Sequence, residues 1–391
     1  MIERVRVGTG RPAELLERAR IATGLHDFGE DSFRDGLERL VGALDREARL
    51  TETGAAAFAG QIVHFLSQRL QVEGWYHRHP EIDDEQIIAP LIGLGLPRTG
   101  STVMSFLLGQ DLHARSLRSW ESTSPCPPPT VQTADTDPRI EATRATLERR
   151  NAAFPRMRAM FPADPNGPTE CQALMAMDFK SQIFQALARV PSYAEWLNRD
   201  ADLEPTYRFH KRVLKLLQWR YPTERWRLKS PSHIVFIDDL NTVYPDARFW
   251  MTHRDVASVV PSSADLYCEL AHGFSDDVDP LYAGQLNADV WEIGLHRLIA
   301  FRAAGNDHRF LDAMFTEMQA DPFPTLERLY AFTGEALTPE TRARMAAWRA
   351  ATPRERHGEP RYGLADFGLD DDALRARFRF YNERFGLLSP A

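Results

Sequence analysis

The sequence predicts an α/β protein in which helices flank a central parallel sheet, preceded by an N-terminal helical segment. Two strand–turn–helix units, at about 87–110 and 225–254, carry this prediction. A short apolar strand followed by an amphipathic helix, repeated along the chain, is typical of parallel sheets. The third observation is a helical periodicity that fills the chain before the first strand, from Pro12 to Val72.

The N-terminal segment divides into three amphipathic helices. Thr51, followed by Glu52 and Gly54, indicates the break between the second and the third. Apolar residues recur at helical spacing in each helix. They are Leu15, Leu16 and Ile21, then Leu37, Leu40, Val41 and Leu44, and finally Phe58, Ile62, Val63 and Leu66.

The first strand–turn–helix unit opens with the apolar run 87–94, which predicts a strand buried on both faces. Pro90 cannot donate a hydrogen bond to a neighbouring strand, so we place it near the start of this strand. A glycine-bearing turn follows at 95–102. The pattern from Ser101 to Gln110 then predicts a helix.

The second unit contains a short strand at 226–229, a helix for which Ser232 is the expected N-cap, and a strand at 247–252. Between the units, the proline-rich stretch 122–168 predicts a lid-like excursion over the carboxyl edge of the sheet. From about Trp291 onward the pattern is mostly helical.

Length and composition favour a single domain, 1–391, made of a helical segment (1–86) and an α/β core (87–391). The net charge of −8 argues against a nucleic-acid surface. The charged N-terminus argues against a signal peptide, and no run reaches the roughly 20 apolar residues of a membrane span. The three cysteines match no zinc spacing and are expected to be free thiols. Free thiols are typical of a reducing compartment, so the expected location is the cytoplasm.

The turn between the first strand and its helix has the chemistry of a phosphate site. Successive backbone N–H groups, together with the helix N-terminus, form a cradle for an anion in such a turn. The stretch 95–102 (GLPRTGST) nearly matches the P-loop pattern, which makes the predicted fold P-loop-like. Ser101 stands where the lysine that binds nucleoside triphosphates belongs, and the cation is Arg98 instead. A P-loop nucleotide kinase, which needs that lysine and a Mg²⁺ site, is therefore the weaker alternative.

A second anion-binding element follows the strand at 247–252. Arg254 comes directly after that strand, and Ser262 lies eight residues further on. If Asp255 caps a helix there, Ser262 is about two turns along it, and Pro261 would kink the helix next to it. A guanidinium and a hydroxyl group at this separation can hold one phosphate monoester from two sides.

Together these motifs resemble those of the bacterial branch of the sulfotransferases, which use 3′-phosphoadenosine 5′-phosphosulfate (PAPS). The loop P-R-T-G-S-T is similar to their 5′-phosphosulfate loop. Arg254 and Ser262 are similar to their 3′-phosphate motif, with Val256 in the place of a usual proline. The stretches 226–233 (WRLKSPSH), 362–369 (YGLADFGL) and 23–29 (TGLHDFG) also fit that group.

The resemblance implies an enzyme that moves the sulfuryl group of PAPS to a hydroxyl group of a small acceptor, without a metal. The product nucleotide would be 3′-phosphoadenosine 5′-phosphate. The residues that bind the nucleotide would be Pro97, Arg98, Thr99, Gly100, Ser101, Thr102, Arg254, Ser262 and Tyr362. Tyr362 belongs to the segment 356–369, which would fold over the nucleotide.

Sulfuryl transfer needs an aligned hydroxyl group, a base for its proton and cations beside the leaving oxygen. The expected base is Glu121, which resembles the glutamate base of the tyrosylprotein sulfotransferases at nearly the same distance from the loop. Glu170 is the second choice. Arg98 and Lys229 are expected to stabilise the departing oxygen.

The apolar character of the excursion at 122–168 favours a hydrophobic alcohol or phenol as the acceptor. A non-catalytic nucleotide-binding protein is the other alternative, and a base far from the reacting sulfur would favour it. The sequence leaves the oligomeric state open.

Overall fold

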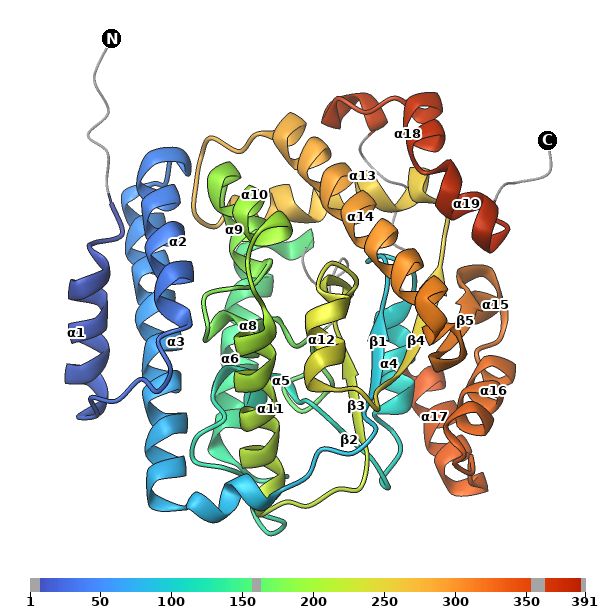
Figure 1. Ribbon diagram of the computed structural model, residues 1–391, viewed down its shortest axis with the longest axis horizontal. Coiled ribbons are helices and arrows are strands. Elements are labelled where there is room, and N and C mark those ends of the chain that lie inside the picture. The colour runs from blue at the N-terminus through green and yellow to red at the C-terminus, as the bar shows by residue number, and fades with distance from the viewer. Residues whose placement is uncertain (1–7, 157–162, 353–362, 388–391) are drawn as a thin grey trace.

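The computed structural model describes residues 8–156, 163–352 and 363–387. Within these ranges, helices surround one five-stranded sheet with the strand order β2-β3-β1-β4-β5 (Figure 1). All neighbouring strands in it are parallel, which confirms the predicted fold class. The strands are β1 (Leu91–Leu94), β2 (Arg115–Ser116), β3 (Trp226–Lys229), β4 (Arg248–His253) and β5 (Phe310–Met314).

The three predicted N-terminal helices are present as α1 (Pro12–Thr23), α2 (Phe33–Glu47) and α3 (Glu52–Arg78). They lie together at one side of the molecule, away from β4 and β5 (Figure 1). Thr51 is the N-cap of α3, and its hydroxyl oxygen accepts a hydrogen bond from the Gly54 N–H at 2.9 Å.

Strand β1 is shorter than predicted, because it begins only after Pro90. The side chain of Ile88 is exposed, and Ala89 has a left-handed φ of +41°. The chain therefore turns before the proline, which still accepts a hydrogen bond through its carbonyl from Arg248 N–H at 3.1 Å. Within β1, a Cβ at Gly93 would lie 2.2 Å from the side chain of Trp250, so glycine is required there.

The second unit has its strands as predicted, but Ser232 is not a helix cap. It lies inside a short 3₁₀ helix, η2 (Pro231–Ile234), where its hydroxyl contacts that of Ser230 at 2.7 Å. The α-helix begins later, as α12 (Ile237–Val243). Strands β2 and β5 were not predicted: β2 has two residues, and β5 interrupts a region that we expected to be mostly helical.

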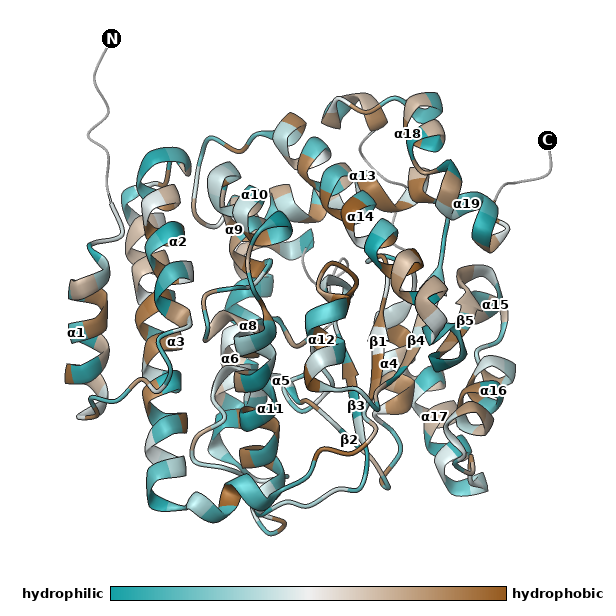
Figure 2. Cartoon of the chain, in the orientation of Figure 1, coloured by the Kyte–Doolittle hydropathy of each residue, from teal (hydrophilic) through white to brown (hydrophobic). Residues whose placement is uncertain are grey.

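The remaining helices cover both faces and the ends of the sheet. The interior is mainly apolar, and Figure 2 colours β1 and α4 mostly brown. These helices are α4 (Ser101–Leu108), α5 (Ser119–Thr123), α6 (Pro138–Ala153), α8 (Gln172–Ala176), α9 (Ile183–Leu187), α10 (Pro191–Arg199), α11 (Glu204–Trp219), α13 (Val256–Ala271), α14 (Pro280–Phe301), α15 (Phe315–Ala320), α16 (Phe323–Thr333), α17 (Pro339–Ala351), α18 (Asp371–Arg377) and α19 (Arg379–Phe385). Short helical turns η1 (Pro80–Asp84), η3 (Arg302–Asn306), η4 (Asp307–Arg309) and η5 (Leu364–Phe367) join them.

The excursion at 122–168 contacts the segment before β3 and the helix that follows β4. Near its proline-rich start, the Val131 N–H donates to the carbonyl of Arg220, a residue that precedes β3. Just beyond α6, Arg156 forms an ion pair of 2.7 Å with Asp265 of α13.

Candidate active site

The predicted phosphate loop joins β1 to α4 and adopts the tight conformation that its glycines allow. Gly95 and Gly100 have φ angles of +117° and +85°. Arg98 also has a left-handed φ of +63°, which costs a residue with a Cβ about 1–2 kcal/mol. Thr99 is buried, and its hydroxyl lies 2.6 Å from that of Thr252. The loop is therefore tied to the carboxyl end of β4.

The two anion-binding elements that the sequence indicated lie side by side. The Arg98 Nε donates to the Ser262 hydroxyl oxygen at 3.1 Å, and the Arg254 Nη1 donates to the Arg98 carbonyl at 3.0 Å. The Arg254 guanidinium also lies 4.4 Å from the centre of the Phe315 ring. Residues that are 164 positions apart in the chain thus form one cationic cluster.

Helix α13 begins where the sequence predicted. The Asp255 carboxylate accepts a hydrogen bond from the Ala257 N–H at 3.2 Å and so caps the helix. Pro261 lies inside α13, next to Ser262. The N-termini of α4 and α13 therefore both lie beside the cluster, where their partial positive charges favour an anion.

The donor groups of this cluster can hold an anion. They are two guanidinium groups, a hydroxyl group and two helix N-termini, the same chemistry that proteins use to bind phosphates. A Cβ at Gly100 would lie 3.2 Å from the Phe315 ring, so a larger residue would narrow the cradle. Tyr362 and residues 356–361 lie outside the described residues.

Lys229 and Glu170 form a close pair at the same edge of the sheet. Lys229 is the last residue of β3 and pairs in register with Gly93 of β1, two residues before the phosphate loop. Its Nζ donates to the Glu170 Oε1 at 2.6 Å, and its carbonyl accepts from the Cys171 N–H at 3.1 Å. The side chain of Lys229 is 6% exposed and that of Glu170 is 20% exposed, so the carboxylate is the more accessible partner.

Glu121 is placed differently, because it is fully buried in an ion pair. Its Oε1 lies 2.5 Å from the Arg115 guanidinium, and its Oε2 accepts from the Arg118 N–H at 3.1 Å. Burial lowers the pKa of Arg115, and the charge of Glu121 acts against that change. Both carboxylate oxygens of Glu121 therefore serve a structural contact.

Arg115 also shows which end of the sheet Glu121 faces. It pairs with Trp226, the first residue of β3, whereas Lys229 is the last. Its guanidinium donates to the carbonyls of Leu217 and Tyr221, which precede β3. Through Arg115, the structure thus links Glu121 to the starting end of β3.

A buried histidine lies close behind Lys229. The Nδ1 of His233 is 2.8 Å from the Tyr207 hydroxyl. Burial, with smaller effects of His210 and Lys229, lowers the pKa of His233 well below its usual range. The imidazole is therefore neutral and supports the strand end beside Lys229.

A second network supports Arg254 from the C-terminal side. His253 contacts Asp312 of β5 at 2.8 Å and the Tyr381 hydroxyl of α19 at 3.1 Å, and Arg302 pairs with the same Asp312 at 2.7 Å. Burial would raise the pKa of Asp312, but the hydrogen bonds from Arg302 and His253 outweigh burial and lower it. The carboxylate thus stays charged and holds the end of β4.

Sequence reasoning missed the contacts of Thr252, Phe315 and Tyr207 with this site. Thr252 is the last residue of a predicted strand, and ligands bind at the carboxyl ends of parallel strands. Its position in the strand was therefore the feature of the sequence that could have indicated its place in the site. No sequence motif marks Phe315 or Tyr207.

The described residues also bear on metal binding and membrane insertion, two functions that the sequence made improbable. No group of three or more His, Cys, Asp or Glu side chains among them is arranged to hold a metal ion. None of the helices in the described ranges is both long and apolar enough to cross a membrane.

Comparison with known proteins places the chain in a family. A family model described as "Sulfotransferase family" matches residues 90–339. Sulfotransferase STF9 from Mycobacterium avium has 33% sequence identity and a TM-score of 0.90 over 99% of both chains. Sulfotransferase STF1 from Mycobacterium tuberculosis H37Rv has 32% identity and a TM-score of 0.85, over 95% of this chain and 99% of its own. A comparison with curated protein sequences finds no match. The model match and these two structures show that the chain belongs to the sulfotransferase family.

Proposed function

We propose that the protein transfers the sulfuryl group of PAPS to a hydroxyl group of a small hydrophobic acceptor by in-line displacement. Family membership supports sulfuryl transfer in general. The observation that carries the finer proposal is the contact between Arg98 and Ser262, because it joins the two predicted phosphate elements into one site. A donor that carries phosphate groups at the 3′ and 5′ positions of its ribose would use both elements.

We propose the cytoplasm as the compartment in which the protein acts.

We propose Glu170 as the base, in place of Glu121. Glu170 lies at the carboxyl edge of the sheet with Lys229, while Glu121 is held by Arg115. In the proposed step Glu170 accepts the proton of the acceptor hydroxyl, the acceptor oxygen forms a bond to sulfur, and the bond from sulfur to the phosphate oxygen breaks. A positioned base contributes roughly 10²–10⁴-fold to such a reaction.

Lys229 and Arg98 would stabilise the negative charge that develops on the departing phosphate oxygen. Fixed cations in a site that excludes water stabilise a developing charge more than water does. Arg254 and Ser262 would hold the 3′-phosphate and so orient the donor. The step needs no metal in this scheme, and the metal-free reaction stays a prediction.

The position of Glu121 would by itself favour the alternative of a nucleotide-binding protein without turnover. The Lys229–Glu170 pair supports catalysis instead, since it supplies a base and a cation together. The test is transfer of label from radiolabelled PAPS to a panel of simple alcohols and phenols. Labelled product with the unaltered protein, and its loss in Glu170→Gln, would support the proposal. Tight nucleotide binding with no transfer to any acceptor would favour the binding protein.

A further inference from the structure

Two helices near the C-terminus contact the segment of the chain that carries Arg254. The Arg375 guanidinium of α18 forms an ion pair of 2.7 Å with the carboxylate of Asp255, which follows Arg254 directly. The Tyr381 hydroxyl of α19 lies 3.1 Å from the His253 ring and also contacts the backbone of Arg254. The end of β4 and the start of α13 are therefore both held by the C-terminal helices.

The carboxylate of Asp255 serves two different partners. One oxygen accepts from the Ala257 N–H at 3.2 Å and caps α13, and the other oxygen pairs with Arg375. Capping explains why an acidic residue stands here. Its negative charge is nevertheless next in the chain to Arg254, the arginine proposed to bind a phosphate, and like charges repel. Arg375 reduces that repulsion, because it places a positive charge on the oxygen that does not cap the helix.

The exposure of this ion pair indicates what Arg375 does. Both side chains are partly exposed, and exposed ion pairs contribute little to stability. Loss of Arg375 should therefore change the charge around Arg254 more than it changes the fold. A second ion pair of 2.9 Å, with Asp371 one turn earlier in α18, helps to fix the direction of the Arg375 side chain.

We propose that Arg375 is a positioning residue of the 3′-phosphate site and acts through Asp255. By compensating the charge of Asp255, it lets the phosphate approach Arg254 and Ser262 with less repulsion. This inference rests on the proposed function and adds a residue that selects nucleotides with a 3′-phosphate. It also gives the C-terminal helices a part in binding the donor.

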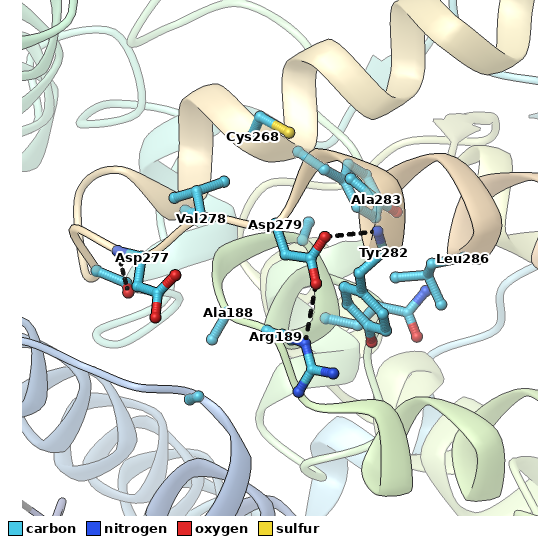
Figure 3. A pocket seen from close by; sticks show the side chains of 15 residues that line it. Ala188, Arg189, Cys268, Asp277, Val278, Asp279, Tyr282, Ala283 and Leu286 are labelled. Atoms are coloured by element: carbon cyan, nitrogen blue, oxygen red, sulfur yellow. Dashed lines mark hydrogen bonds and ion pairs between the residues drawn. The ribbon is translucent and has the colours of Figure 1, made fainter. Parts of the chain in front are cut away.

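The molecule contains a matched ion pair at the start of another helix. Figure 3 shows Asp279, whose carboxylate accepts from the Tyr282 N–H at 3.0 Å and lies 3.5 Å from Arg189. Asp279 caps α14 as Asp255 caps α13, and the side chains of both pairs are 26–40% exposed. No predicted nucleotide-binding residue lies at the start of α14. Arg189→Ala is therefore the control for loss of an arginine from a capping aspartate.

The experiment measures the dissociation constants of 3′-phosphoadenosine 5′-phosphate and of AMP by calorimetry. Arg375→Ala should weaken binding of the bisphosphate about three- to tenfold and affect AMP little, because a phosphate with up to two charges then meets an uncompensated carboxylate. Arg375→Lys should restore most of the affinity. Arg189→Ala should change the affinity for neither nucleotide. If Arg375→Ala does not fold, Arg375→Gln makes the same test.

The substitution Asp255→Asn decides whether Arg375 acts through Asp255. Asparagine caps a helix about as well as aspartate and carries no charge. In an Asp255→Asn background, Arg375→Ala should cost no further affinity for the bisphosphate, and a double-mutant cycle measures this. The same three- to tenfold loss in that background would overturn the proposal. So would an unchanged bisphosphate affinity in Arg375→Ala, or an equal loss for both nucleotides. If the unaltered protein does not bind 3′-phosphoadenosine 5′-phosphate, the proposed function has failed, and the inference with it.

Discussion

The two candidate bases make opposite predictions, and one pair of variants separates them. Glu170→Gln keeps an oxygen that can accept from Lys229 but can no longer take a proton from the acceptor. We expect kcat to fall roughly 10²–10⁴-fold. The Glu170 side chain is 20% exposed and that of Glu121 is fully buried, so we expect a smaller loss of stability than in Glu121→Gln, and little change in affinity for 3′-phosphoadenosine 5′-phosphate.

Glu121→Gln is expected to do the reverse. It leaves the Arg115 guanidinium, whose side chain is 6% exposed, without its counter-ion. Loss of one partner of a buried ion pair costs about 3–5 kcal/mol. The entropy of unfolding for 391 residues is about 0.8 kcal/mol per kelvin, so the melting temperature should fall by about 4–6 °C. Below that temperature, kcat should be near that of the unaltered protein.

The assays are calorimetric melting and single-turnover transfer from radiolabelled PAPS at a temperature where both variants are folded. The reasoning would be refuted if Glu121→Gln were inactive with an unchanged melting temperature while Glu170→Gln turned over normally. Glu121 would in that case act in catalysis despite its buried contact with Arg115.

Three further predictions concern the nucleotide site and stability. Arg254→Ala and Ser262→Ala should each weaken binding of 3′-phosphoadenosine 5′-phosphate in calorimetry, the arginine by about 10–100-fold, because hydrogen bonds to charged groups contribute about 1.5–3 kcal/mol. AMP, which lacks the 3′-phosphate, should bind both variants as it binds the unaltered protein, and an equal loss for both nucleotides would count against the assignment. Arg98→Gly should melt at least 1 °C above Arg98→Ala, because glycine adopts the φ of +63° without strain, while both lose nucleotide affinity; equal melting temperatures would contradict this. Burial raises the pKa of Asp239 from 3.8 to about 6, so its charge destabilises the fold above pH 6 and that cost fades as the pH falls towards 4. Asp239→Asn should therefore raise the melting temperature at pH 7.5 and have little effect at pH 4, and a pH-independent difference would exclude this cause.

Local patterns in the sequence predicted the elements that position the nucleotide site. The three N-terminal helices, β3, β4 and the cap at Asp255 follow from periodicity and from capping residues, which act over a few positions. Arg98, Arg254 and Ser262 were placed by their positions after strands. Parallel strands all end at one edge, so such residues meet there.

The elements that were missed depend on partners far away in the chain. Strand β5 (FLDAM) has no strict alternation and becomes a strand because it pairs with β4, from Phe249 with Phe310 to His253 with Met314. Sequence distance from the loop suggested Glu121, but its role depends on Arg115, whose own partners include the carbonyl of Leu217, 102 residues away. Glu170 and Lys229 are 59 residues apart, and only the fold shows that their side chains meet.

The central claim is that the site binds the nucleotide of PAPS. Calorimetric titration with 3′-phosphoadenosine 5′-phosphate, in parallel with ATP and Mg²⁺, tests it most directly. We predict micromolar binding of the bisphosphate, weakened in Arg254→Ala, and no comparable binding of ATP with Mg²⁺. Preference for ATP with Mg²⁺ would contradict the assignment of both phosphate elements and leave the nucleotide kinase as the better interpretation.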